Sequence, residues 1–286
     1  MSSFNYLVRL INSNGQTRYG NLNSYKPTSE IVGCEVEVLS GSIEDGFTKT
    51  SEVATVKTLL SPVEKAHQII CIGINYRRHA NEANLTVPRY PVVFSKPPDA
   101  LAGPFDDVPI PATAQDMLDY EGELTVVVGK TGKDIPESEA LSYVLGYTVG
   151  NDVSARHFQL PDTSGGQYCY AKSFDAFAPV GPLIASPNAI PDPQKLTYRT
   201  KVNGDLRQET GTDDMVWSVK QIIAHLSKGT TLRAGTLIMT GTPSGVGLFM
   251  EPKGFLKDGD VVEVEVDGIG SIVNKMVFSS LGPSTI

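Results

Sequence analysis

Cysteines and long apolar runs are scarce in this 286-residue sequence. The three cysteines, Cys34, Cys71 and Cys169, are widely spaced and odd in number, so they indicate neither a disulfide framework nor a cysteine metal site. No stretch approaches the ~18 apolar residues of a membrane helix, and the N-terminal segment lacks the pattern of a secretory signal. We therefore expect a cytoplasmic protein without a membrane partner, and a location in the mitochondrial matrix stays open.

Positive charge is also scarce. The chain has 24 lysines and arginines against 32 aspartates and glutamates, and no cluster of cations is longer than the pair Arg77 and Arg78. The sequence therefore lacks the basic footprint of a nucleic-acid-binding protein. The net charge of −8 instead favours solubility and the attraction of divalent cations.

Helical patterns are few as well. The clearest is Met215–Ser227, where apolar residues recur at helical spacing, and a shorter one at Pro136–Leu145 opens on a proline and acidic residues. Apolar and β-branched runs predict strands at residues 6–10, 35–39, 69–72, 92–95, 124–128, 144–149, 183–185, 196–202, 237–240 and 261–266. We therefore predict a mainly β fold with a few helices (α+β).

The strand pattern divides into two units. Asn-Gly and Gly-Ser turns interrupt the first runs, and the segment Ser61–Glu64 has the composition of a linker. We predict a small β-rich N-terminal domain at residues 1–66 and a larger catalytic domain at residues 67–286.

The strongest chemical signal is a pair of glutamates at the head of an apolar strand. Glu121 and Glu123 are two residues apart, so a strand directs both to the same face. Adjacent carboxylates repel each other unless one is protonated or a cation neutralises them. The pattern is compatible with a metal site, and equally with solvated glutamates at an exposed strand end.

A third carboxylate favours the metal. Asp152 follows the apolar run Tyr143–Gly150 and precedes a polar, turn-like segment, so it also lies at the end of a predicted strand. Three oxygen ligands without cysteine or histidine suit Mg²⁺ or Mn²⁺, with Ca²⁺ as a possible substitute, better than Zn²⁺.

A histidine and a glutamate form a second candidate group. His79 and Glu82 are three residues apart, so a helical turn brings them to one face, where the carboxylate can orient the imidazole as a general base. The alternative is a solvated surface pair. Lys96, Arg156 and Lys172 are cations that can pair with a substrate carboxylate or an enolate, or form structural ion pairs.

Seven motifs together resemble the fumarylacetoacetate hydrolase superfamily, in the order of that family and over about residues 68–278. They are Gly73–Glu82, Phe94–Pro97, Tyr120–Leu124, Asn151–Arg156, Ala171–Asp175, Lys201–Gln208 and Leu237–Gly247. The resemblance implies a mixed-sheet β-roll of the fumarylacetoacetase C-terminal-like fold and a homodimer. One departure is His157, where many members of the family have an acidic residue.

The resemblance also implies roles for individual residues. Glu121, Glu123 and Asp152 are expected to hold Mg²⁺ or Mn²⁺. His79 and Glu82 are expected to form the catalytic dyad, with Lys172 beside the metal and the substrate oxygens. The expected substrate-binding residues are Lys96, Arg156, Gln159 and Thr242.

These roles predict a divalent-metal enzyme that acts on a small 2-oxo or 1,3-dicarbonyl acid through a metal-stabilised enolate. The first hypotheses are hydrolysis of a carbon–carbon bond in an acylpyruvate or fumarylpyruvate and decarboxylation of oxaloacetate. Keto-enol tautomerisation of oxaloacetate is the alternative reaction. A non-catalytic protein that binds 2-oxo acids is the alternative of another class.

Overall fold

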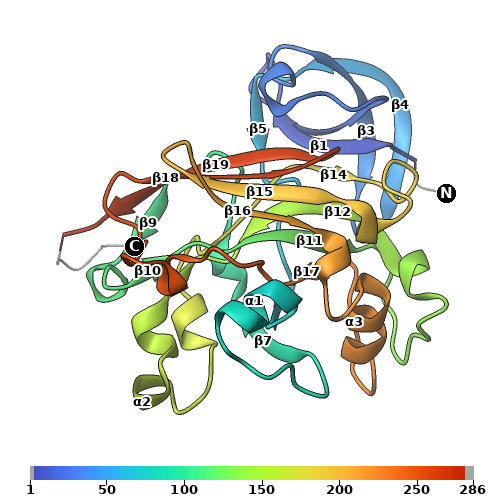
Figure 1. Ribbon diagram of the computed structural model, residues 1–286. Helices are drawn as coiled ribbons and strands as arrows, with labels where there is room; N and C mark the ends of the chain where they lie inside the picture. The colour runs from blue at the N-terminus through green and yellow to red at the C-terminus, as the bar shows by residue number, and fades with distance from the viewer. Residues whose placement is uncertain (1–2, 281–286) are drawn as a thin grey trace.

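The computed structural model describes residues 3–280 and shows that strands dominate, as the sequence predicts (Figure 1). The α-helices of these residues are α1 (Arg77–Glu82), α2 (Pro161–Ser164) and α3 (Val219–Leu226). The strands are β1 (Tyr6–Ile11), β2 (Thr17–Leu22), β3 (Glu35–Ser42), β4 (Gly46–Thr55), β5 (Thr58–Leu60), β6 (Ile69–Gly73), β7 (Val92–Lys96), β8 (Leu101–Ala102), β9 (Val108–Ile110), β10 (Leu118–Asp119), β11 (Gly122–Val128), β12 (Val144–Asn151), β13 (Ser154–Ala155), β14 (Ala178–Ala185), β15 (Thr197–Val202), β16 (Asp205–Gly211), β17 (Leu237–Met239), β18 (Val261–Val266) and β19 (Gly270–Phe278). All ten predicted strands are present, and the mainly β prediction is confirmed.

Two mixed sheets form the core. The larger has 12 strands, most of them in the order β4-β3-β2-β1-β14-β12-β11-β17-β6-β7, and the smaller has the order β16-β15-β18-β19-β9. Strands β11, β12 and β14 of the larger sheet contact β15, β18 and β19 of the smaller one. Every residue of β11 and β14 is buried, which explains why β11 is mostly apolar after the glutamates.

The N-terminal strands continue the larger sheet. Strand β1 pairs with β14 through Tyr6 opposite Ala185 and Leu7 opposite Ile184, and the β1–β5 strands form the upper part of the molecule in Figure 1. Apolar side chains from both predicted domains share the same buried clusters. The boundary between residues 66 and 67 stays a prediction, and it lies in the loop that connects β5 to β6 of the same sheet.

Both predicted helices are shorter than expected. Helix α3 begins after Ser218, which forms a capping box with Gln221, because Met215 is extended and pairs with Tyr76. The second prediction, Pro136–Leu145, is wrong as an α-helix: the segment forms a single 3₁₀ turn at Ala140–Tyr143. Val144 and Leu145 already belong to β12, whose pairing with β11 limits the turn. Within residues 3–280, no helix has the length and apolar character needed to cross a membrane.

Candidate active site

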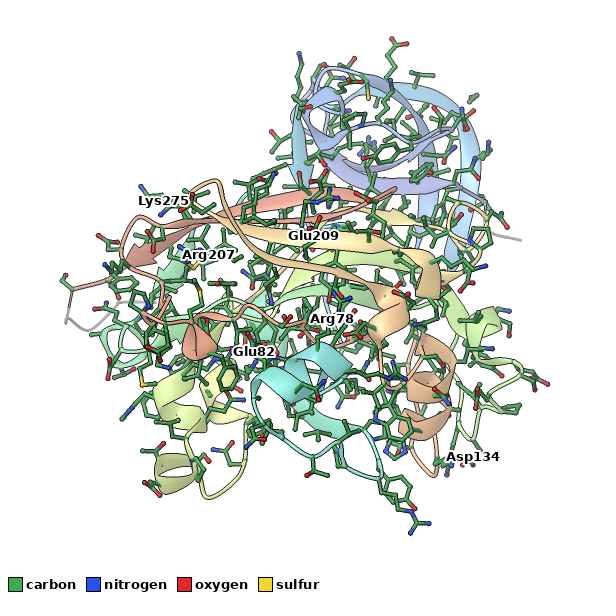
Figure 2. The ribbon with its side chains drawn as sticks, in the orientation of Figure 1. Arg78, Glu82, Asp134, Arg207, Glu209 and Lys275 are labelled. Atoms are coloured by element: carbon green, nitrogen blue, oxygen red, sulfur yellow. The ribbon has the colours of Figure 1, made fainter. Side chains whose placement is uncertain are left out.

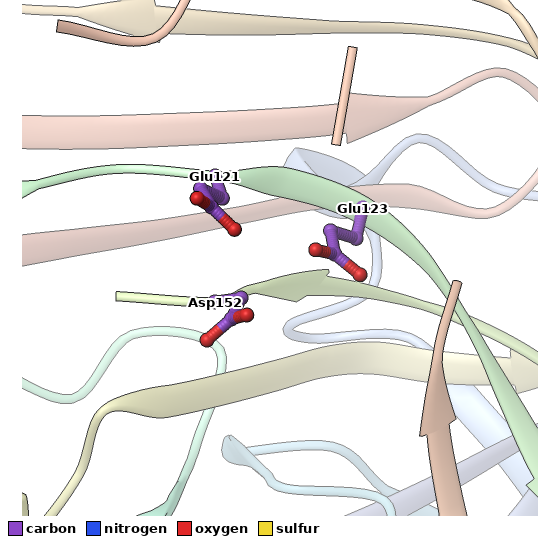
Figure 3. Close-up of side chains that lie close together, drawn as sticks. All are labelled: Glu121, Glu123 and Asp152. Atoms are coloured by element: carbon purple, nitrogen blue, oxygen red, sulfur yellow. The ribbon is translucent and has the colours of Figure 1, made fainter. Parts of the chain in front are cut away.

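The ends of β11 and β12 bring the three predicted metal ligands together. Strand β11 is antiparallel to β12, with Glu123 opposite Gly150, and the N–H of Asp152 donates to the carbonyl of Glu121 at 2.8 Å. One carboxylate oxygen from each of Glu121, Glu123 and Asp152 lies within 4.8 Å of the others, and all three side chains are buried (Figure 3). The strand spacing of two residues thus produces a convergent oxygen site.

Buried cations neutralise part of this charge. Nζ of Lys172 lies 2.8 Å from both Glu121 and Asp152, and Nη1 of Arg156 lies 2.6 Å from Glu121. Burial raises the pKa of Glu121, but Lys172 and Arg156 outweigh it and bring that pKa to about 2. Burial lowers the pKa of Lys172, yet Asp152 and Glu121 raise it above its ordinary value, so this lysine stays a cation.

Glu123 is the carboxylate that lacks a cationic partner in the described residues. Its Oε2 accepts a hydrogen bond of 2.7 Å from the N–H of Gly241. Burial, followed by the charges of Asp152 and Glu121, raises its pKa well above the ordinary value. A bound cation removes this repulsion, whereas a solvated glutamate would need no such partner.

Asp152 supplies a second sign that the donor set fits a cation. Nζ of Lys96 lies 2.6 Å from its Oδ1, but that ammonium donates to the carbonyls of Val153, Lys172 and Phe177 at 3.1, 2.8 and 2.8 Å. An ammonium has three N–H donors, so none remains for Oδ1. This buried oxygen therefore has no hydrogen bond in the structure of residues 3–280. Three convergent carboxylates, one of them with an oxygen that accepts no hydrogen bond, fit Mg²⁺ or Mn²⁺.

The predicted dyad is also formed. His79 and Glu82 lie on α1, and Nδ1 of His79 is 3.2 Å from Oε2 of Glu82. The other oxygen of Glu82 accepts a hydrogen bond of 3.0 Å from the N–H of Gly245. Because a carboxylate accepts and does not donate, Nδ1 carries the hydrogen, which leaves Nε2 of His79 as the basic nitrogen.

One cavity of about 300 Å³ is lined by His79 of the dyad and by Glu121 of the carboxylate group. His79, Glu121 and Lys172 line it on the polar side. Its other walls are largely apolar and come from Ile72, Leu85, Phe94, Leu160, Leu248 and Phe249. His79 and Glu121, one of the three clustered carboxylates, therefore face the same space, which has room for a small organic acid.

Comparison with known proteins identifies the family of this chain. The model of the fumarylacetoacetate (FAA) hydrolase C-terminal family matches residues 68–277. The chain belongs to the fumarylacetoacetate hydrolase family. It is an enzyme of that family, and the family resemblance and the predicted fold are both confirmed.

Individual members of the fumarylacetoacetate hydrolase family are similar over most of the chain. The mitochondrial oxaloacetate tautomerase fahd2 of Xenopus laevis is 45% identical over 220 residues, which are 77% of this chain and 68% of that protein. The mitochondrial oxaloacetate tautomerase FAHD2B of Bos taurus is 42% identical over 220 residues, 77% of this chain and 69% of that protein. The crystal structure of a 5-carboxymethyl-2-hydroxymuconate delta-isomerase from Mycobacterium smegmatis has a TM-score of 0.81 and 32% identity, and the match covers 96% of this chain and 100% of that one.

Three of the four predicted substrate-binding residues line the cavity, and Lys96 does not. Arg156, Gln159 and Thr242 line the cavity. The hydroxyl of Thr242 donates to the carbonyl of Gly122 and accepts from Gln208, so it is part of the wall structure. Lys96 is not among the cavity-lining residues: its Nζ lies against Asp152, one of the three clustered carboxylates.

Asp119 is a buried charged residue of the site to which the sequence patterns assigned no role. Its Oδ2 accepts hydrogen bonds from Nε of Arg156 at 2.8 Å and from the N–H of Leu248, and its Oδ1 accepts from the N–H of Gly247. Asp119 therefore orients the arginine that lies against Glu121. The alternation of Asp119, Glu121 and Glu123 is the signal that could have identified it.

Replacement of Asp119 by asparagine is expected to lower the free energy of unfolding by about 3 to 5 kcal/mol, because Arg156 would lose a buried partner. Urea unfolding followed by circular dichroism measures the change. The matched control is Asp267→Asn, which breaks the more exposed pair between Nη1 of Arg199 and Asp267 and is expected to cost less than about 1 kcal/mol. Equal losses in the two variants would contradict a structural role for the Asp119 pair.

Proposed function

We propose that this enzyme catalyses the keto-enol tautomerisation of a small 2-oxo dicarboxylic acid, with oxaloacetate as its first candidate substrate and Mg²⁺ or Mn²⁺ as its cofactor. The observation that carries the proposal is the cavity lined by both His79 and Glu121, because Glu121 groups with the carboxylates of Glu123 and Asp152. The names of the similar oxaloacetate tautomerases favour proton transfer over the hydrolysis and decarboxylation that the sequence placed first.

The residues of the site have separate roles in the proposed proton transfer. Glu121, Glu123 and Asp152 would hold the divalent ion, which polarises a chelating 2-oxo acid and makes the hydrogens beside its carbonyl more acidic. His79 takes the proton from carbon through Nε2 and returns it to oxygen, or the reverse. Glu82 stabilises the imidazolium that forms between the two transfers.

The cations of the site can stabilise the negative charge of the reacting acid. Nη2 of Arg156 is buried and has no hydrogen-bond partner in the structure of residues 3–280, so it is an available donor for a substrate carboxylate. Lys172 is a fixed cation rather than a base, because its pKa is raised by Asp152 and Glu121. Its charge favours an enolate over the neutral keto form.

Enol-oxaloacetate is the substrate that tests the proposal. Its ultraviolet absorbance is expected to decay faster with enzyme and Mg²⁺ than in buffer, and a coupled lactate dehydrogenase assay is expected to detect no matching release of pyruvate. The control is the same enzyme in excess EDTA, where only the spontaneous decay should remain. Release of stoichiometric pyruvate would show that the reaction is decarboxylation and not tautomerisation. Decay of the enol no faster than in buffer would contradict both reactions.

A further inference from the structure

One glycine-rich segment, residues 241–248, holds three carboxylates with different roles. The N–H of Gly241 donates to Glu123 at 2.7 Å, and the N–H of Gly245 donates to Glu82 at 3.0 Å. The N–H of Gly247 donates to Asp119 at 2.8 Å. A metal-binding residue, a dyad residue and the partner of Arg156 are thus positioned by main-chain groups of the same short segment.

The backbone of this segment requires glycine at the position that holds the dyad. Gly245 has a φ of 102°, in the left-handed region that other residues rarely adopt. A Cβ atom at Gly245 would lie 2.0 Å from the carbonyl oxygen of Arg207 on β16, and a main-chain oxygen cannot rotate away. The peptide N–H is therefore held in place by the close approach of two backbone segments.

Helix α1 depends on outside contacts for its position. It has six residues and no side-chain N-cap, so its internal hydrogen bonds are too few to stabilise it alone. At its first turn, Arg77 donates to the carbonyls of Asp214 and Met215. At its last residue, Glu82 accepts from Gly245. Figure 2 shows Glu82 and Arg78 on α1, below β16 in that view.

We propose that Gly245 is a positioning residue for the base of the reaction proposed above, on which this inference rests. Its N–H holds Oε1 of Glu82, so that Oε2 faces Nδ1 of His79. Because Gly241 of the same segment holds Glu123, the base and the metal-binding carboxylates keep a constant separation. The catalytic geometry is assembled when α1 lies against this segment.

Amide hydrogen exchange tests the contact without any turnover. In Glu82→Ala the Gly245 amide is expected to exchange about 10-fold faster than in wild type, because its acceptor is gone. In Glu82→Gln the amide oxygen remains an acceptor, so exchange is expected to stay within about 3-fold of wild type. The internal control is the Gly247 amide, which donates to Asp119 and should not change in either variant. Equal exchange of Gly245 in wild type and Glu82→Ala would overturn the proposal.

A double-mutant cycle tests whether Gly245 acts through Glu82. Gly245→Ala is expected to lower kcat about 30-fold in the wild-type background, with KM within about 2-fold, and to lower it less than about 3-fold further in Glu82→Ala. The matched control is Gly204→Ala, which has a φ of 87° and no atom within 4 Å of its added Cβ. Equal losses in the two backgrounds would reduce Gly245 to a structural role. If wild type fails to convert enol-oxaloacetate, the proposed function fails, and the exchange result still decides the role of Gly245.

Discussion

Glu123→Gln is expected to lower kcat by at least about 1,000-fold and to remove the stabilisation of the protein by Mg²⁺. The reason is that burial and the charges of Asp152 and Glu121 raise the pKa of Glu123. A bound cation relieves this repulsion, so we expect Mg²⁺ affinity to depend most on this carboxylate. At about 100 times its dissociation constant, Mg²⁺ is expected to add about 2.7 kcal/mol to wild type. The variant is expected to show no such gain.

Without metal, the same variant is expected to be at least as stable as wild type. A neutral amide removes the repulsion from Asp152 and Glu121 and still accepts the hydrogen bond of Gly241. Thermal unfolding of both proteins in EDTA and in Mg²⁺ measures the two effects. The control is Glu263→Gln on β18, where Lys201 is 3.5 Å away at the surface. A variant that keeps the Mg²⁺ shift would remove Glu123 from the metal site.

His79→Ala is expected to lower kcat by about 100- to 10,000-fold, the usual contribution of a general base. The metal site should stay intact, because the ion pair of His79 is with Glu82 on α1 and not with one of the three carboxylates. The shift of Tm in Mg²⁺ is therefore expected to match that of wild type. Loss of activity with retained metal binding separates the base from the metal ligands.

The matched control for this variant is His67→Ala. His67 also pairs with a glutamate, Glu44, but about half of its side chain is exposed and the pair lies away from the cavity. Its replacement is expected to leave kcat unchanged. Full turnover of His79→Ala would remove the dyad from the mechanism, whichever substrate is used.

Local patterns predicted ten strands correctly, because most of these combine β-branched composition with clear turns, but they did not identify others, such as β4 and β19. Strand β11 is an example, since its apolar run from Leu124 to Val128 has to be covered on both faces. The helix prediction for residues 136–145 is wrong because strand pairing outweighs local composition there: Val144 pairs with β11. Sheet order depends on pairings between distant segments, such as β1 with β14, which no local pattern contains.

The site was predictable to the extent that chain order and strand spacing reveal it. Spacing placed Glu121 beside Glu123, but the ion pair of Asp119 with Arg156 joins residues 37 positions apart. The position of Lys96 against Asp152 likewise depends on the packing of three carbonyls around one ammonium. The individual roles at the site, the homodimer and the cellular location stay predictions.

The pairing of β1 with β14 limits how the protein can open. Two units joined by a flexible linker can rotate about a hinge, but here main-chain hydrogen bonds and a shared apolar core connect them. Rotation of the N-terminal unit would break both. Entry of a substrate is therefore expected to depend on short surface segments, α1 and the loop around α2, which border the cavity and consist of helices of six and four residues. These segments, rather than a domain hinge, are expected to set the rate of substrate exchange.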